Sequence, residues 1–218
     1  MATLTTTPIL TRVAALIQDP TNVRWPKPEL LAYLSDGQRE LCLFKPDACA
    51  KTAVVDLVAD TRQVLPSDGV VLIDVVRNMA GSKRAPRVVT REILDVQTPD
   101  WHTSTPDVDV KYYTFDPQNQ RVFYVYPPNT GTGSLEVVYA VSPPELADGD
   151  ALQVDSVWLP ALVNYVMYRC YSKDAEYAAN ANLAVAYYQA FTNLLAGKTS
   201  AEAALDARQN SVGTAAKG

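Results

Sequence analysis

The chain has 218 residues and a formal net charge of −5 at pH 7, with 48% hydrophobic and 20% charged residues. This composition is typical of a globular protein and excludes bulk disorder. The acidic balance argues against general affinity for DNA or for anionic membranes, since both favour a basic surface. Residues 1–7 lack the features of an export signal, and charged or polar residues interrupt the apolar segments well before a membrane-spanning length. We therefore expect a soluble protein assembled in a cytoplasm.

The first 50 residues predict two helices. A Thr-Pro pair at residues 7–8 is a helix start signal, and apolar residues follow at helical spacing as far as residue 19. The second helix is expected over residues 27–45, because a Lys-Pro pair stops it. Gly37 lies in its middle and costs about 1 kcal/mol relative to alanine. Close packing against the alanine-rich helix farther along the chain and a merely tolerated glycine are both open interpretations of Gly37.

Between residues 51 and 141 the helical period gives way to short extended runs. The predicted strands cover residues 52–58, 62–65, 70–77, 87–90, 110–115, 120–126 and 135–141. The clearest hairpin joins residues 111–115 to 120–126 through an Asp-Pro turn with aromatic and β-branched flanks. Residues 93–101 predict a helical turn followed by a loop. These runs favour a small antiparallel sandwich.

Residues 155–197 predict a long helical hairpin, interrupted at Ser172-Lys173-Asp174. Gly197 stands where a helix C-terminal stop is expected. Neither helix can bury its apolar stripe alone, so the rest of the chain or a neighbouring subunit must cover it. The tail after Lys198 has helix-forming residues but little apolar surface, so we expect a partner to order it.

The predicted fold class is α+β, with an antiparallel β-sandwich-like insertion between an N-terminal and a C-terminal helical pair that together form a helical bundle. Residues 1–50 are the N-terminal helices, residues 51–150 the β insertion, residues 151–197 the C-terminal helical hairpin and residues 198–218 a C-terminal arm.

Residues that could perform catalysis are scarce. His102 is the one histidine, so a histidine-based metal cluster within one chain is excluded and an ordinary loop role is expected. The glycines at 131 and 133 lack the Lys-Ser/Thr of a phosphate loop, and the cysteines form no C-x-x-C pair. We therefore predict no enzyme and no catalytic, metal or cofactor site.

Positive charge is concentrated in one stretch. It comprises Arg77, Lys83, Arg84, Arg87 and Arg91. This stretch is interpreted either as a solvated hairpin loop or as a contact to an acidic partner surface or to passing DNA. Candidate partner-binding residues are Lys83, Arg84, Arg87 and Arg91 here and Leu205 and Arg208 in the tail.

Four stretches carry a resemblance to a known family. They are WPKPELLAYL at 25–34, TPDW at 98–101, YTFD with FYVYPP between 113 and 128, and LPALVNY through YSKDAEY between 159 and 177. Their succession resembles the head–tail adaptor proteins of tailed bacteriophages, the group that includes tail tubular protein A of short-tailed phages. The resemblance covers roughly residues 8–197.

The resemblance implies a virion structural protein at the head–tail junction. It implies a homo-oligomeric ring, commonly a dodecamer, that joins the portal protein to the tail nozzle or tail tube and encloses part of the DNA channel. Genomic DNA would pass through the lumen without specific binding, and no membrane is involved. The alternatives are another phage neck or tail-completion protein, or a β-sandwich module whose tyrosines bind a glycan or a protein. Those tyrosines are Tyr112, Tyr113, Tyr124, Tyr126 and Tyr139.

Overall fold

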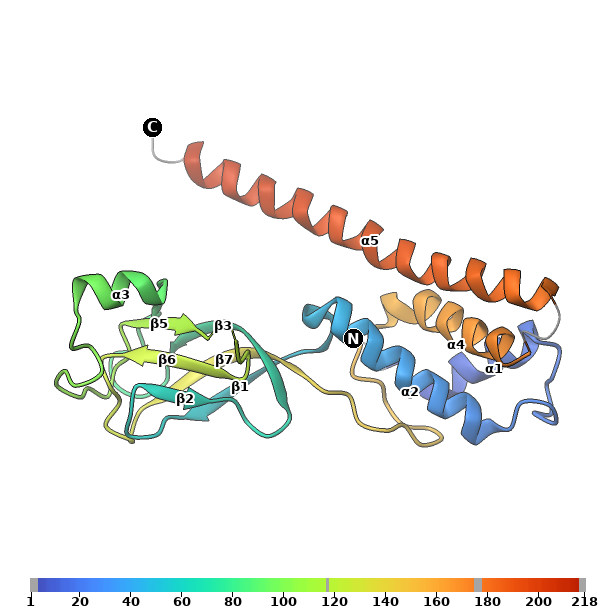
Figure 1. Ribbon diagram of the computed structural model, residues 1–218, viewed down its shortest axis with the longest axis horizontal. Coiled ribbons are helices and arrows are strands. Elements are labelled where there is room, and N and C mark those ends of the chain that lie inside the picture. Colours follow the sequence, from blue (N-terminus) through green and yellow to red (C-terminus); the bar gives the residue numbers. More distant parts are fainter. Residues whose placement is uncertain (1–3, 117, 175–177, 216–218) are drawn as a thin grey trace. The chain divides into compact units, whose positions relative to one another are not determined.

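The computed structural model describes residues 4–116, 118–174 and 178–215, and for residues 198–215 it describes the backbone alone. The chain divides into two compact units (Figure 1). The helical unit comprises Met1–Lys45 and Pro143–Gly218, and the β unit comprises Pro46–Ser142. The α+β prediction is therefore confirmed, with the sheets inserted between two pairs of helices.

The described residues of the helical unit form four long helices. They are α1 (Thr6–Leu16), α2 (Lys27–Phe44), α4 (Leu159–Lys173) and α5 (Ala178–Ala215), with a short 3-10 turn, η2 (Ser156–Trp158), before α4. Proline occupies the first turn of α2 and of α4, where its missing N–H costs nothing. Asp155 caps η2, because its carboxylate accepts the N–H of Val157 at 2.9 Å. Both predicted helical pairs are confirmed.

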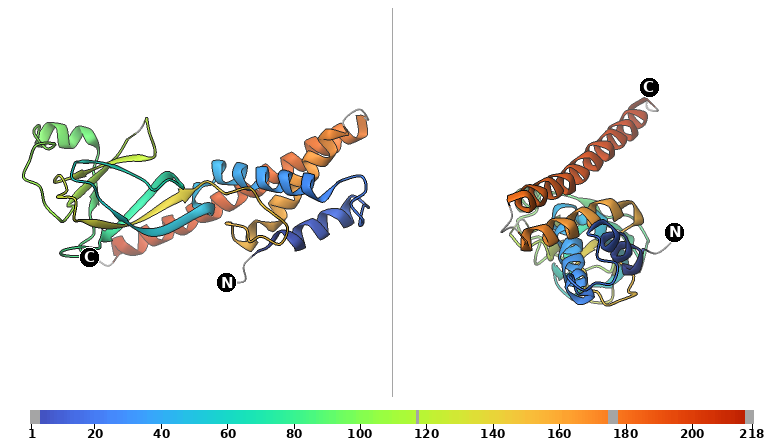
Figure 2. Two further views of the ribbon diagram at one scale, coloured as in Figure 1. Left: turned by 90° about the horizontal axis from the view of Figure 1, so that it is seen from below. Right: turned by 90° about the vertical axis from the view of Figure 1, so that its right-hand side faces the viewer.

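Helix α4 is the centre of the bundle. It contacts α1 and α2 on one side and α5 on the other (Figure 2). Leu162, Val166 and Met167 are completely buried in it. An apolar stripe of this kind is stable only when neighbouring elements exclude water from it.

Gly37 of α2 faces the ring of Tyr165 on α4. A Cβ atom at position 37 would lie 2.6 Å from Cδ1 of that ring, which is closer than side chains pack. The glycine therefore permits close helix packing. Its neighbour is α4, and not the alanine-rich helix α5 that the sequence suggested.

The predicted helix end at Gly197 is wrong, because α5 continues without a break to Ala215. A glycine stops a helix when it adopts a positive φ. The positive-φ glycines among the described residues are Gly81, Gly131 and Gly149, so Gly197 stays helical.

Outside residue 117, the β unit forms seven strands, a 3-10 turn η1 (Pro46–Cys49) and a short helix α3 (Arg91–Gln97). The strands are β1 (Ala50–Asp56), β2 (Arg62–Val64), β3 (Gly69–Asn78), β4 (Arg87–Val88), β5 (Tyr112–Phe115), β6 (Val122–Tyr126) and β7 (Ser134–Val141). All seven predicted strands are confirmed, with ends shifted by at most two residues. The predicted turn of the β5–β6 hairpin includes Pro117, which lies outside the described residues.

Two sheets form this unit, one in the order β1-β7-β3 and one in the order β2-β6-β5-β4. All strand pairs are antiparallel except β4 with β5, which is parallel. Phe123, Val125, Leu135 and Val137 from the two sheets are completely buried. The hydroxyl of Tyr113 on β5 donates to Asp74 of β3 at 2.8 Å and so links the sheets. The expectation of a sandwich-like insertion is confirmed.

The segment that returns from the β unit follows the helices through polar contacts. Ser35 accepts the N–H of Leu146 at 3.0 Å, and Gln38 accepts the N–H of Gln153 at 2.9 Å. Thr6 accepts the N–H of Gly149 at 2.8 Å. These three backbone N–H groups of the irregular segment thereby have hydrogen-bond partners on the helices.

Candidate interaction surfaces

The basic loop connects β3 to β4. Gly81 has a φ of +67°, and the carboxylate of Asp109 accepts the N–H of Ser82 through both oxygens at 3.1 Å. A side chain at position 81 would collide with this carboxylate, so the turn requires glycine there. The side-chain amide of Asn78 donates to the carbonyl of Arg84 at 2.8 Å. The backbone of the loop is thus anchored while its basic side chains are exposed.

The structure separates the five basic residues of this stretch into two groups. Arg77 donates to Glu136 at 2.7 Å, and Arg91 lies 3.7 Å from Asp95 and over the ring of Tyr124. Lys83, Arg84 and Arg87 are exposed and form no ion pair within the described part of the chain. These three residues are the part of the predicted set that is free to meet a partner.

Opposite charges lie close to this loop. A groove of about 340 Å³ is lined by Arg84, Arg87 and Lys111, and also by Asp107 and Asp109. A groove of mixed charge favours a protein surface, whose own charges alternate, over the uniform negative charge of a nucleic-acid backbone.

The two predicted residues of the tail, Leu205 and Arg208, lie on α5. The backbone there is helical, but their side chains lie outside the described ones, so their role in binding a partner stays a prediction.

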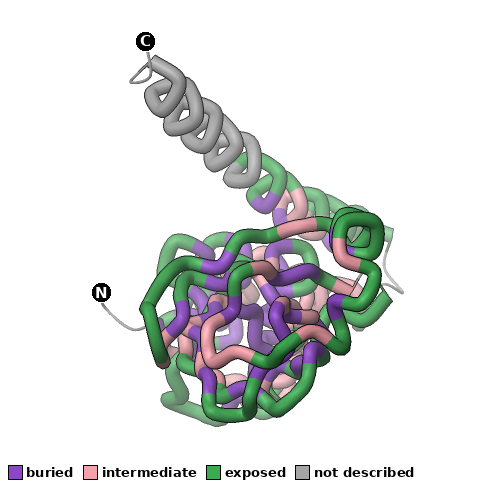
Figure 3. Tube along the Cα trace, turned by 90° about the vertical axis from the view of Figure 1, so that its left-hand side faces the viewer, coloured by how far each residue is buried: buried purple, intermediate pink, exposed green. Residues whose placement is uncertain are grey.

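The first 20 residues of α5, from 178 to 197, contain no charged residue. Three of them, Ala184, Phe191 and Leu195, are buried against the bundle. Most of the others are exposed, and Figure 3 shows this part of the helix as mostly green. Leu183, Val185 and Leu194 are between 41% and 57% exposed. The sequence reasoning treated this helix as having one stripe, although the absence of charge on every side could have revealed a larger surface.

Two of the tyrosines proposed for a glycan face are in the core instead. Tyr113 and Tyr139 are 3% and 1% exposed. Tyr112 and Tyr126 stack on each other at the surface, with ring centroids 6.1 Å apart. Tyr113 and Tyr139 are therefore packing residues of the β unit and are not available to a glycan.

His102 is held in place by its neighbours. Its ring stacks on Trp101 with centroids 3.6 Å apart, and its Nδ1 lies 2.8 Å from the hydroxyl of Thr61. Trp101 is completely buried and donates from its indole N–H to Asp95 at 2.8 Å. These contacts give His102 the role of a loop anchor, and no carboxylate completes a catalytic triad with it in the described contacts.

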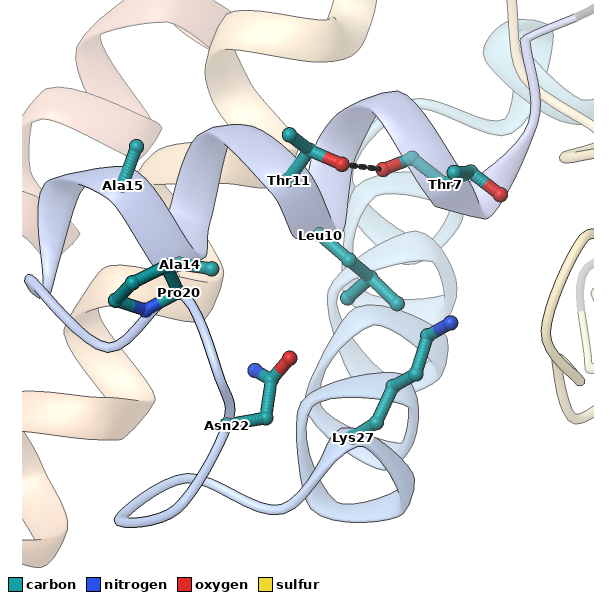
Figure 4. A pocket seen from close by; sticks show the side chains of 8 residues that line it. All are labelled: Thr7, Leu10, Thr11, Ala14, Ala15, Pro20, Asn22 and Lys27. Carbon is teal, nitrogen blue, oxygen red and sulfur yellow. Dashed lines mark hydrogen bonds between the residues drawn. The ribbon is translucent and has the colours of Figure 1, made fainter.

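A groove of about 240 Å³ lies beside α1 (Figure 4). Its lining consists of Thr7, Leu10, Thr11, Ala14, Ala15, Pro20, Asn22 and Lys27. The hydroxyl of Thr11 donates to the carbonyl of Thr7 at 2.9 Å, as Figure 4 shows. This lining offers no carboxylate, histidine or thiol for acid–base or nucleophilic chemistry.

Cys170 is a buried thiol of α4. Burial, together with the negative charges of Glu29 and Asp174, raises the pKa of the Cys170 thiol to about 12. Such a thiol stays protonated and unreactive. Over the described ranges, no group of three or more histidine, cysteine, aspartate or glutamate side chains could hold a metal ion.

The two distinctive surfaces of the described residues are an anchored loop with exposed basic side chains and a largely exposed helix stretch without charge. The chain matches the model of the SU10 adaptor protein family over residues 4–215, and it therefore belongs to this family of phage head–tail adaptors. The predicted resemblance is confirmed. The chain is accordingly a virion component with a structural, non-enzymatic role.

No curated protein matches the chain significantly. Within the described residues, no helix combines the length and the apolar character that crossing a membrane requires.

Proposed function

We propose that the chain assembles into a ring, commonly of twelve copies, that joins the portal protein to the tail nozzle or tail tube. The family match over residues 4–215 is the observation that carries this proposal. The uncharged, largely exposed stretch of α5 supports it, because soluble monomers rarely expose a large contiguous apolar surface.

DNA passes through the lumen of such a ring without being bound specifically. Twelve copies at −5 each carry a formal charge near −60. A lumen of the same sign repels phosphates and limits adhesion during ejection.

The direct test is negative-stain imaging of the purified chain mixed with the portal protein of the same virion. The expected result is a second ring stacked on the portal ring. A chain that remains monomeric and unattached overturns the proposal. A ring that forms but does not attach to the portal would instead favour another neck or tail-completion protein with a different partner.

The C-terminal arm contacts the portal in this proposal. Helix α4 has 15 residues and is about 22 Å long, whereas α5 has 38 residues and is about 57 Å long. The last turns of α5 therefore extend beyond what α4 can cover. Deleting residues 199–218 should leave the melting temperature of the bundle unchanged and weaken portal attachment in a pull-down. Unchanged attachment would remove the arm from the proposal.

The basic loop contacts an acidic surface of an adjoining subunit. Replacing Lys83, Arg84 and Arg87 by glutamate should impair assembly of the ring or neck, because it converts attraction into repulsion. The matched control is Arg62→Glu, an exposed basic residue of β2 outside the loop. Normal assembly by the triple variant would exclude the loop from the interface.

A further inference from the structure

Apolar side chains line one flank of α5 and extend outward from the helix. Leu183, Tyr187, Ala190 and Leu194 recur every three or four residues, so they share one side of the helix, here called the leucine flank. Tyr187 stacks on Tyr171 of α4 with ring centroids 5.6 Å apart. Leu183 and Leu194 are 41% and 42% exposed, so α4 holds the base of this flank and leaves its leucines uncovered.

The opposite flank of α5 is hollow. Val185 follows Leu183 by two positions, about 200° around the helix. Together with α4 it forms a groove of about 410 Å³, here called the α4–α5 groove. The groove is lined by Tyr168, Ser172, Ala181, Ala184, Val185, Tyr188 and Gln189, none of which is charged. The ring centroid of Tyr168 lies 4.9 Å from that of Tyr188, and the hydroxyl of Tyr188 donates to Glu40 at 2.9 Å. These contacts within one chain hold both walls of the α4–α5 groove in place.

The single chain covers only the strip between the two flanks. That strip is Ala184, Phe191 and Leu195. Apolar side chains on the flanks of a helix are normally buried by a neighbouring element, whereas Leu183, Val185 and Leu194 are between 41% and 57% exposed. Residues 178–197 span about 30 Å, and a face of that length and about 10 Å in width is roughly a third of the ~800 Å² that one partner contributes to a standard interface. A protein surface, and not a small ligand, is needed to cover it.

We infer that the occupant is a second copy of this chain: the leucine flank of one α5 inserts into the α4–α5 groove of the next copy. Both surfaces lack charge, so their contact desolvates no ion. One protrudes and the other is hollow, and they lie on opposite sides of one helix. This is the arrangement of a head-to-tail interface, which closes into a ring when the rotation between copies permits. One kind of partner then covers both flanks of every copy. The inference rests on the ring proposed above and assigns its subunit interface.

The first test removes each surface separately, with the portal protein present. Leu183→Glu/Leu194→Glu charges the leucine flank, and Val185→Glu/Gln189→Glu charges the groove. All four positions are exposed, so circular dichroism should show unchanged folding. The matched control, Val58→Glu/Val96→Glu, places two glutamates at exposed apolar positions of the β unit outside the basic loop. We expect both α5 variants to lose the ring in negative stain and the control to keep it. A ring formed by either α5 variant overturns the inference.

The second test identifies the pairing in the assembled ring. Chains with Leu194→Cys are mixed with chains with Val185→Cys, assembled on the portal protein and treated with a short bismaleimide. The expected cross-link joins position 194 of one copy to position 185 of another, and the chain without an added cysteine is the background. Cross-links between identical positions, or none above background, overturn the inference.

These results are distinguishable from failure of the proposed function. If the unmodified chain neither forms a ring nor attaches to the portal, the proposed function itself is wrong. If the unmodified chain and both α5 variants form equal rings on the portal, only the assigned interface is wrong.

Discussion

Helices α4 and α5 are consecutive and pack on each other, yet they are covered very differently. Of the 15 residues of α4, seven are buried. Of the first 20 residues of α5, only Ala184, Phe191 and Leu195 are buried. The apolar surface of α4 therefore completes the core of the single chain, whereas much of the apolar surface of α5 is left uncovered by that chain.

The distribution of charge makes the same distinction. Arg169 and Lys173 at the edge of α4 that meets α2 form ion pairs with Asp36 and Glu29 of α2. Residues 178–197 of α5 carry no charge, although most of them are exposed. A helix whose outer side faces solvent normally carries charged or polar residues on that side. The lack of charge on this stretch of α5 supports the inferred contact with a second copy.

The largest expected effect comes from the residue that joins the two helices. Phe191 is completely buried, with its ring centroid 5.3 Å from that of Tyr165. Phe191→Ala should lower the free energy of unfolding by about 3–5 kcal/mol, because it removes buried area and leaves a cavity. Leu194→Ala, the control three positions later, should change it by less than about 0.5 kcal/mol. Urea unfolding followed by circular dichroism at 222 nm measures both free energies of unfolding. Equal decreases in the two variants would contradict the distinction between the buried strip and the exposed leucine flank of α5.

A smaller effect is expected where α4 meets α2. Gly37→Ala places a methyl group against the ring of Tyr165 and should cost about 1–3 kcal/mol through overpacking, although alanine is the better helix former. Gly197→Ala is the matched control, because a Cβ at position 197 meets nothing within 4 Å. That variant should stabilise α5 by up to about 1 kcal/mol. Thermal melts measure both, and stabilisation by both substitutions would contradict the close packing.

A pH-dependent effect is expected at the loop before α2. The carboxylate of Asp19 accepts the N–H of Trp25, Val23 and Arg24, each at 2.9 Å, and these bonds lower the pKa of Asp19. A lowered folded-state pKa gives stability that is present above the unfolded value of about 4 and is lost as the pH falls below it.

We therefore expect the melting temperature to be nearly constant from pH 6 to about pH 4 and to decrease as the pH is lowered further to 2. Asp19→Asn should melt lower at pH 6 and lose less on acidification, since it cannot change its charge. An Asp19→Asn curve parallel to that of the unmodified chain would show that the carboxylate does not contribute.

The smallest perturbation uses thiol reactivity as a probe of the two helices. Cys170 on α4 has a pKa raised by burial to about 12 and should resist maleimide at pH 7.5. A cysteine introduced as Leu194→Cys on α5 should react about 100-fold faster or more in the unassembled chain. Mass spectrometry of the labelled peptides measures both rates. Comparable labelling rates would mean that Cys170 on α4 is as accessible to the reagent as position 194 on α5.

Local patterns predicted most of the fold. Alternating β-branched and aromatic residues located all seven strands, and proline pairs located the starts of α1 and α2. The end of α5 was predicted wrongly because Gly197 is compatible both with a helix and with a stop, and only the backbone conformation decides. The parallel pairing of β4 with β5 depends on contacts distant in sequence, which no local pattern encodes.

The interaction surfaces were less predictable. The sequence located the basic loop, but it did not show which of its basic side chains form ion pairs. In the structure Arg77 pairs with Glu136 and Arg91 with Asp95, whereas the other three basic residues are exposed. The contact between Gly37 and Tyr165 likewise requires the packing of α2 on α4. The α4–α5 groove arises from two helices and has no sequence motif of its own.

The most direct measurement is an electron cryo-microscopy map of the chain assembled on its portal protein, at a resolution that separates helices. The map should show each α5 wedged between two copies, with Leu183 and Leu194 in the groove formed by the next copy. A map in which α5 faces solvent on both flanks, or in which the chain attaches as separate monomers, would contradict the assignment of this helix to the ring interface.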